Sequence, residues 1–201
     1  MKYLLVCLLL IGIPAWLEAQ STGAELIDAS ISFHDPEGKW SAANLVLGFN
    51  DTRPGKEDRP ASFSFNNTTG TACVTRILDG KKISWHITND QCSYEIDGRT
   101  AISQEEIEQY RLTKERGMTM RNYYLYLWGL PMKLKDPGTI IDPKVYDKTF
   151  NGLPAKVAKI TYDEEVGSDI WYFYFAPDSF ELIGYQFYHD EQKGDGEYIT
   201  L

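Results

Sequence analysis

TACVTRILDGKKISWHITNDQCSYEIDG, residues 71–98, is the stretch that decides the fold of this chain. The turn dipeptides Asp79-Gly80 and Asn89-Asp90 separate three runs rich in β-branched and aromatic residues, a pattern that predicts three antiparallel strands. A two-residue turn at Asn89-Asp90 sets the register of the second hairpin. The register gives one apolar face, with the pairs Ile87 and Cys92, Trp85 and Tyr94, and Ile83 and Ile96.

This meander bears on the two cysteines that follow the N-terminal apolar run. Cys73 falls on the first strand and Cys92 on the third, so their backbones lie about 10 Å apart at ~4.8 Å per strand. A disulfide needs Cα atoms within about 7 Å of each other, whereas exported chains normally oxidise their cysteines. The sequence leaves the Cys73–Cys92 pairing open.

The chain begins with a segment typical of export. In MKYLLVCLLLIGIPAWLEAQS, Lys2 precedes the apolar run Tyr3–Ile13, and Pro14 ends that run before a small residue suited to cleavage, Ala19. The run is shorter than the ~20 residues that a membrane-spanning helix needs. We therefore expect residues 1–19 to be a cleaved signal peptide. The product is expected to have no transmembrane span and to be soluble, in the periplasm or outside the cell.

The composition is that of an acidic globular protein. Of the 201 residues, 43% are hydrophobic and 24% are charged, and the formal net charge is −9. This length allows one domain with a sizeable core. The acidic balance argues against nucleic acid, whose phosphates require clustered Lys and Arg. We expect residues 20–201 to form a single domain, truncated at its C-terminus because EYITL stops in the middle of a strand pattern.

Two capping boxes predict where helices begin. Thr22 and Glu25 form the first box, at the start of an apolar stripe, and Ser103 and Glu106 form the second. Gly117 is the expected end of the helix that the second box begins, since glycine commonly follows the last helical turn. A further helical turn or two is expected before residue 129.

Alternating apolar residues predict strands on both sides of this helical region. Before the meander they lie in WSAANLVLGFN and ASFSFNN; after the helices they lie in VYDKTF, AKVAKITY, IWYFYFA, FELIGYQFYH and EYITL. The order is a helix, about five strands, a helical insert and about five strands, which predicts an α+β domain. We expect a strongly curved antiparallel sheet of about ten strands wrapped around the helices.

Several stretches carry a resemblance to a known family: HDPEGKW (34–40), YYLYLWGLPMKLKDPGT (123–139), GYQFYHDE (184–191) and GEYI (196–199). They resemble an uncharacterised family of exported proteins of Gram-negative envelopes, a domain of unknown function. The resemblance implies an envelope location and supplies no catalytic residue.

The layout is also similar to that of the LolA and LolB lipoprotein carriers. There an N-terminal helix precedes an incomplete, highly curved antiparallel barrel whose cavity is capped by helices. The similarity implies an incomplete barrel around a hydrophobic cavity, but fold does not fix function. The basic residue with which the carriers handle cargo cannot be matched to any one Arg or Lys of this chain.

The aromatic run NYYLYLWGLPMKLKDPG, residues 122–138, has three interpretations. As a stripe at helical spacing it packs on the sheet and completes the core. As a lid it covers a cavity for an acyl chain, in which Met adapts to variable shapes. As an exposed patch it docks a protein partner. With two meander residues included, the lid interpretation gives these candidate ligand-binding residues: Tyr123, Tyr124, Tyr126, Leu127, Trp128, Leu130, Met132, Trp85 and Tyr94.

Two acidic turns, 162–169 and 188–197, fall at the same end of the predicted sheet when hairpin reversals are counted. Their carboxylates suit Ca²⁺ or Mg²⁺, and a histidine among them suits a transition metal. No EF-hand spacing occurs, and acidic turns are usually just solvated. We therefore expect no metal and no cofactor, while the candidate ligands are Asp163, Asp169, His189, Asp190 and Glu191.

Enzyme motifs are absent from the sequence. There is no nucleophile elbow, no HExxH, no phosphate loop and no GxGxxG after a strand. The leading expectation is therefore an exported non-enzymatic protein that holds a lipid, an acyl chain or another hydrophobic small molecule. The alternatives are an interaction module with a filled core that binds an envelope protein, and a metal-dependent enzyme at the acidic turns.

Overall fold

The computed structural model describes residues 21–52, 55 and 57–201. The expected signal peptide, residues 1–19, lies outside the described residues. The elements, in chain order, are α1 (Gly23–His34), η1 (Trp40–Ala42), β1 (Asn44–Asp51), β2 (Arg59–Asn66), β3 (Thr71–Leu78), β4 (Lys81–Thr88), β5 (Gln91–Ile96), α2 (Gln104–Tyr110), α3 (Lys114–Trp128), η2 (Met132–Lys135), β6 (Thr139–Phe150), β7 (Leu153–Tyr162), β8 (Ile170–Phe175), β9 (Leu182–Tyr188), η3 (Glu191–Lys193) and β10 (Glu197–Thr200). This order confirms the expected α+β class.

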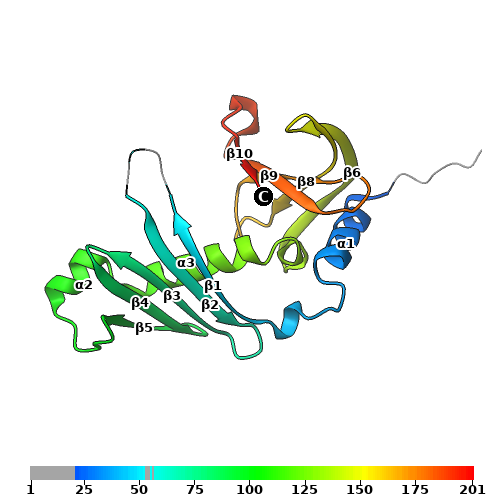
Figure 1. The fold of residues 1–201 in the computed structure, drawn as a ribbon. Coiled ribbons are helices and arrows are strands. Elements are labelled where there is room, and N and C mark those ends of the chain that lie inside the picture. The colour runs from blue at the N-terminus through cyan, green and yellow to red at the C-terminus, as the bar shows by residue number, and fades with distance from the viewer. Residues whose placement is uncertain (1–20, 53–54, 56) are drawn as a thin grey trace, which may run out of the picture.

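The strands form two antiparallel sheets, so the expectation of one sheet of about ten strands is wrong. Strands β1 to β5 make one sheet and β6 to β10 the other, each in sequential order. The helical insert α2 and α3 separates the two groups along the chain. Figure 1 shows the sheets side by side, with α1 against the second sheet and α2 at the outer end of the first. The described strands close no barrel.

The register of the β4–β5 hairpin is the one that the turn residues predict. Ile87 pairs with Cys92, and the next two pairs toward the other end of the strands follow the same register: Trp85 with Tyr94, and Ile83 with Ile96. Asn89 has a φ of 54°, the left-handed conformation that such a turn requires. Local turn chemistry therefore determines this hairpin.

Both described cysteines are free thiols. Cys73 pairs with His86 on β4, whereas Cys92 pairs with the next residue, Ile87. Adjacent residues of a strand point to opposite faces, so the two sulfurs lie on opposite sides of the sheet with β4 between them. Burial raises the pKa of both thiols. Cys73 and Cys92 therefore form no disulfide with each other.

The starts of α1 and α2 are as expected, since both capping boxes are formed. The expected helix end at Gly117 is wrong, and the start of α3 was not predicted. Arg111, in the left-handed conformation, ends α2. The hydroxyl of Thr113 then accepts a hydrogen bond from the Arg116 N–H and begins α3. Gly117 lies inside α3, where an added Cβ would approach the Sγ of Cys92 to 2.6 Å. The glycine therefore permits close packing of the helix on the sheet rather than ending a helix.

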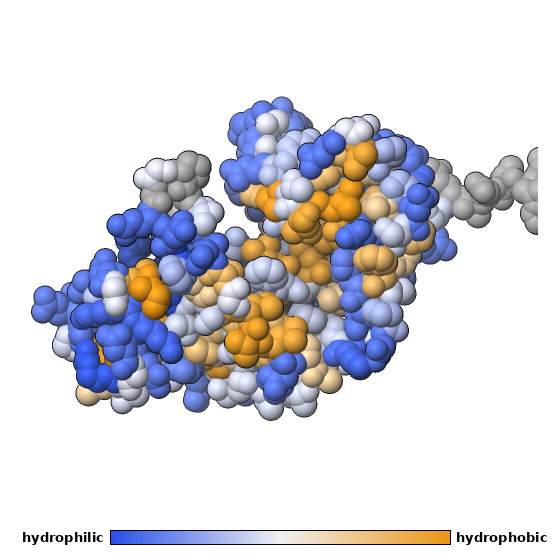
Figure 2. Space-filling view, in the orientation of Figure 1, coloured by the Kyte–Doolittle hydropathy of each residue, from blue (hydrophilic) through white to orange (hydrophobic). Residues whose placement is uncertain are grey.

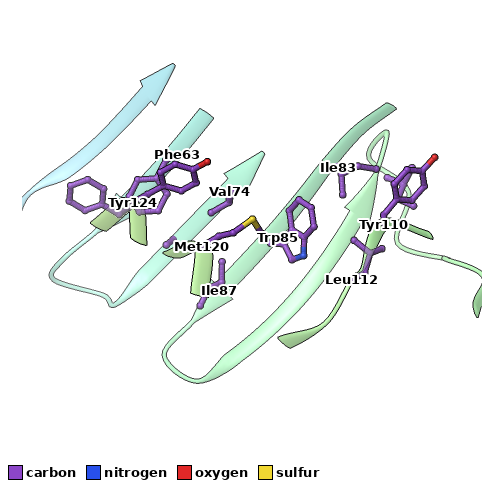
Figure 3. Close-up of a cluster of buried hydrophobic side chains, with 12 residues drawn as sticks. Phe63, Val74, Ile83, Trp85, Ile87, Tyr110, Leu112, Met120 and Tyr124 are labelled. Carbon is purple, nitrogen blue, oxygen red and sulfur yellow. The ribbon is translucent and has the colours of Figure 1, made fainter. Parts of the chain in front are cut away.

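Helix α3 packs against the cores of both sheets. Figure 3 shows the first core, in which Tyr124 and Met120 of α3 meet side chains of the first sheet. Farther along the same helix, Tyr126 and Leu127 pack against the second core. The C-terminal end of α3 therefore lies between the two cores.

Candidate functional site

The C-terminal part of α3 and the turn after it, residues 122–132, are called here the aromatic segment. Three surface hollows adjoin it, of about 510 Å³, about 370 Å³ and about 500 Å³. We call them the arginine groove, the tyrosine hollow and the tryptophan hollow, after residues described below. Figure 2 shows apolar residues gathered over the middle of the molecule, while hydrophilic residues dominate its two ends.

The arginine groove lies between α3 and the core-facing side of β1 and β3. In the sheet register, Phe49 of β1 stands opposite Ala61 of β2, which stands opposite Arg76 of β3. A small alanine between two long side chains leaves space above it. Side chains of α3 that line the groove are Arg116, Thr119, Met120, Tyr123, Tyr124, Leu127 and Trp128.

Aromatic rings form the apolar wall of this groove. The ring of Phe49 lies 5.2 Å from that of Tyr124 and 5.9 Å from that of Trp128, distances typical of favourable aromatic pairs. Tyr124 is nearly buried, whereas Tyr123 and Trp128 remain 58% and 47% exposed. The wall therefore continues from the core to the surface, as an opening for an apolar ligand does.

Two guanidinium groups form the polar part of the groove. Arg76 is largely buried and makes an ion pair of 3.5 Å with Asp51, while no described acidic side chain pairs with Arg116. The Nε atoms of both arginines are buried without an acceptor among the described residues. Burial, with the nearby charges of Arg76 and Arg111, lowers the pKa of Arg116. This end of the groove is thus electropositive in an acidic chain.

The tyrosine hollow lies on the side of the second sheet. The hydroxyls of Tyr126 and Tyr162 share a hydrogen bond of 2.5 Å, and the ring of Tyr126 lies 5.7 Å from that of Trp171. Burial raises the pKa of both tyrosines, so they stay neutral. Asp169 lies at the edge of this hollow. The tryptophan hollow lies between η1 and the end of α3, and Trp40, Trp128 and Met132 are among the residues that line it.

The acidic turns do meet, but their ligand candidates are divided among separate contacts. Nδ1 of His189 lies 2.8 Å from Oδ1 of Asp169, which raises the pKa of the exposed imidazole. The carboxylate of Asp190 forms an ion pair of 2.8 Å with the ammonium group of Lys193. Within the described ranges, no three His, Cys, Asp or Glu side chains gather as a metal group.

Glu191 of the second turn is held by the second sheet. Its carboxylate accepts hydrogen bonds from the Lys159 ammonium at 2.9 Å and from the hydroxyl of Tyr172. These donors lower the pKa of Glu191. The Glu191 carboxylate therefore stabilises the fold around η3. In the other acidic turn, the backbone N–H of Asp163 donates a hydrogen bond to the carbonyl of Gly138.

The model of a family of unknown function, DUF6503, matches residues 1–198. The chain belongs to DUF6503. The match includes the aromatic segment, both arginines of the groove and the acidic turns. A comparison with curated proteins finds no match. In this DUF6503 chain, no helix within the described residues is long and apolar enough to cross a membrane.

The structure distributes the predicted ligand-binding residues of this DUF6503 chain between hollows and cores. Those that line a hollow are Tyr123, Tyr124, Tyr126, Leu127, Trp128 and Met132. Trp85 is fully buried beneath α3, and Leu130 is buried in the second core. Tyr94 is half-buried against the first core. These three fill space between the sheets and the helix and line none of the three hollows.

Sequence reasoning missed the other side of the arginine groove, formed by Phe49, Asp51 and Arg76. The alternation along β3 carried a signal, because Ala72, Val74 and Arg76 share one face. A charged residue on a core face is rarely buried without a role or a partner. No sequence pattern indicated a role for Arg116, because the residues around it depend on how α3 packs against the first sheet.

Proposed function

We propose that this chain is an exported, non-enzymatic binding protein that holds a lipid or acyl chain in the cell envelope. The supporting observation is the arginine groove, about 510 Å³ in volume, whose aromatic wall runs from the first core to the surface. The signal-like N-terminus and the similarity in element order to the LolA and LolB carriers support the same proposal. A carrier-like curvature of the two sheets is part of this hypothesis.

The proposed ligand lies beside the first core, not inside it. Phe63, Val74 and Trp85 are fully buried and fill the space between the first sheet and α3. The alkyl chain instead lies in the groove, where α3 acts as the gate. Each CH₂ group removed from water contributes about 0.8 kcal/mol to binding.

A series of fatty acids tests this proposal by displacement of a bound fluorescent fatty acid. Each two-carbon extension is expected to lower the dissociation constant several-fold until the groove is full. Replacement of the half-exposed Trp128 (Trp128→Ala) removes part of the wall and is expected to weaken binding with little loss of stability. The matched control is Tyr198→Ala, an exposed aromatic on β10 that lines no groove near α3. Binding that is indifferent to chain length would count against the proposal.

A second candidate function is an interaction module that binds an envelope protein through the aromatic segment. The filled first core and the exposure of Tyr123 and Trp128 favour it. Mass spectrometry of organic-solvent extracts from the gently purified protein distinguishes the two candidates. A stoichiometric lipid supports the binding protein, whereas a clean protein that also ignores offered lipids supports the interaction module.

A further inference from the structure

The arginine groove holds more positive charge than its own residues neutralise. Arg76 of β3 and Arg116 of α3 both line it, and Asp51 is the acidic residue among its described lining. Asp51 meets Arg76 through one oxygen at 3.5 Å, a long contact for an ion pair. Each arginine also keeps a buried Nε–H without an acceptor among the described residues. Because solvent does not reach these Nε atoms, an anion in the groove would bond the guanidinium N–H groups that remain open to it.

The arrangement of the two arginines suits one shared anion. They come from different elements, β3 and α3, and line the same groove, where the charge of Arg76 acts on Arg116. A guanidinium presents a planar fork of donors that matches a carboxylate or phosphate. An oxyanion between them would relieve their repulsion and accept from both. Tyr124 lies near the same charges, and its hydroxyl is a further donor.

The apolar wall begins next to these charges. Phe49 stands in the same cross-strand row as Arg76, with only the methyl group of Ala61 between them. The ring of Trp128, which is half-exposed, lies 5.9 Å from that of Phe49. The groove therefore joins a cationic part to an aromatic part, the two surfaces that an anionic amphiphile requires.

We propose that the arginine groove binds an anionic amphiphile, with its oxyanion between Arg76 and Arg116 and its alkyl chain along Phe49 and Trp128. The inference rests on the proposed function and adds the chemical class of the ligand. The head group is a carboxylate, as in a free fatty acid, or a phosphate, as in a lipid head. A neutral lipid offers the guanidiniums only an uncharged acceptor and binds more weakly.

Three ligands with one alkyl chain test the head group: decanoate, decyl phosphate and decanol. Each displaces a neutral fluorescent probe from the purified protein, and the dissociation constants are compared. The anion that fits is expected to bind about 10- to 100-fold more tightly than decanol, the factor for hydrogen bonds to charged groups. The tighter of the two anions identifies the head group as a carboxylate or a phosphate.

Two groove variants and one control locate the anion. Arg76→Gln and Arg116→Gln are each expected to weaken binding of the anion at least tenfold and to leave decanol binding unchanged. Having both variants keeps the test valid if one of them fails to fold. The control is Arg121→Gln, which makes the same charge change on α3. Its guanidinium bonds the carbonyl of Asn89 at 2.6 Å and lines none of the three hollows.

The outcomes separate this inference from the proposed function. If decanol binds as tightly as both anions and the groove variants change nothing, the anion site is wrong, while the hydrophobic-ligand proposal stands. If the anions bind but Arg121→Gln weakens them as much as Arg116→Gln, the site is not between the two arginines and the inference is overturned. If none of the three ligands binds, both proposals fail.

Discussion

Gly117 sets how closely α3 approaches the first sheet. The helix passes over β4 and β5 at this residue, where the Sγ of Cys92 and a ring carbon of Trp85 would lie 2.6 Å and 3.3 Å from an added Cβ. The same close approach brings Arg116, one residue earlier, to the groove. A glycine that resembles a helix end in the sequence is therefore a packing requirement.

We predict that Gly117→Ala destabilises the protein, although alanine normally favours a helix. The added methyl group has no room above Cys92, and overpacking of this kind costs about 1–3 kcal/mol. Chemical denaturation measures the loss. The double variant Gly117→Ala with Cys92→Ala removes the obstructing sulfur and is expected to recover part of it. Gly48→Ala is the control, since a Cβ there meets nothing within 4 Å. Equal effects at the two glycines would contradict the packing explanation.

At the scale of elements, α1 is tied to the second sheet by a histidine. The Leu182 N–H of β9 donates a hydrogen bond to Nε2 of His34 at 3.0 Å. This acceptor must be unprotonated, and burial lowers the pKa of His34 from its ordinary value of 6.5. Leu26 and Ile27 of the same helix are buried in the second core. Hydrophobic burial thus docks α1, and the histidine makes its docking sensitive to acid.

We predict that stability falls on acidification because of His34. Its folded-state pKa is lowered, so the unfolded chain binds more protons, and stability rises with pH in this range. The contribution is complete above about pH 6.5 and is lost as pH falls through the lowered pKa. Urea unfolding between about pH 5 and about pH 8 measures it. His34→Gln keeps an acceptor for Leu182 and is expected to reduce the acid-dependent loss.

The control for this prediction is His189→Gln, because the pKa of His189 is raised by Asp169. A raised pKa contributes stability below about pH 6.5 that is lost as pH rises, the opposite sign. Replacement of His189 should therefore leave the acid-dependent loss of stability in place. A pH profile that is the same with and without His34 would refute the prediction.

At the scale of the whole molecule, α3 makes the two sheets depend on each other. Tyr124 belongs to the first core, and Leu127 packs against the second. The helix cannot lose its contacts with one core without losing support for the other. The two sheets are therefore expected to unfold together, although they share no strand.

We predict a single cooperative transition, measured by hydrogen exchange of β4 and β8 peptides against urea concentration. Ile87→Ala, in the first core, should lower the free energy of unfolding by the usual ~2–5 kcal/mol of a buried truncation, and the urea midpoints of both peptides should fall together. Leu153→Ala, at an exposed position of β7, should change neither. Separate midpoints for the two peptides would show that α3 does not couple the sheets.

The sequence by itself determined the succession of strands, the register of the β4–β5 hairpin, the starts of α1 and α2, and the membership of the α+β class. These features depend on residues a few positions apart: the Asn89-Asp90 turn sets the Trp85–Tyr94 pair, and Thr22 caps a helix through Glu25. The aromatic segment was likewise visible as a candidate site, because its residues are contiguous. Its ligand stays a prediction.

Only the tertiary structure decided that the strands form two sheets, that α3 packs against both, and that Arg76 and Arg116 share one groove. These features depend on which distant apolar faces bury one another, and periodicity identifies a face without naming its partner. Gly117 shows the difference within one residue. Its local pattern is that of a helix end, whereas the sulfur of Cys92, brought beneath it by β5, makes it the point of closest packing.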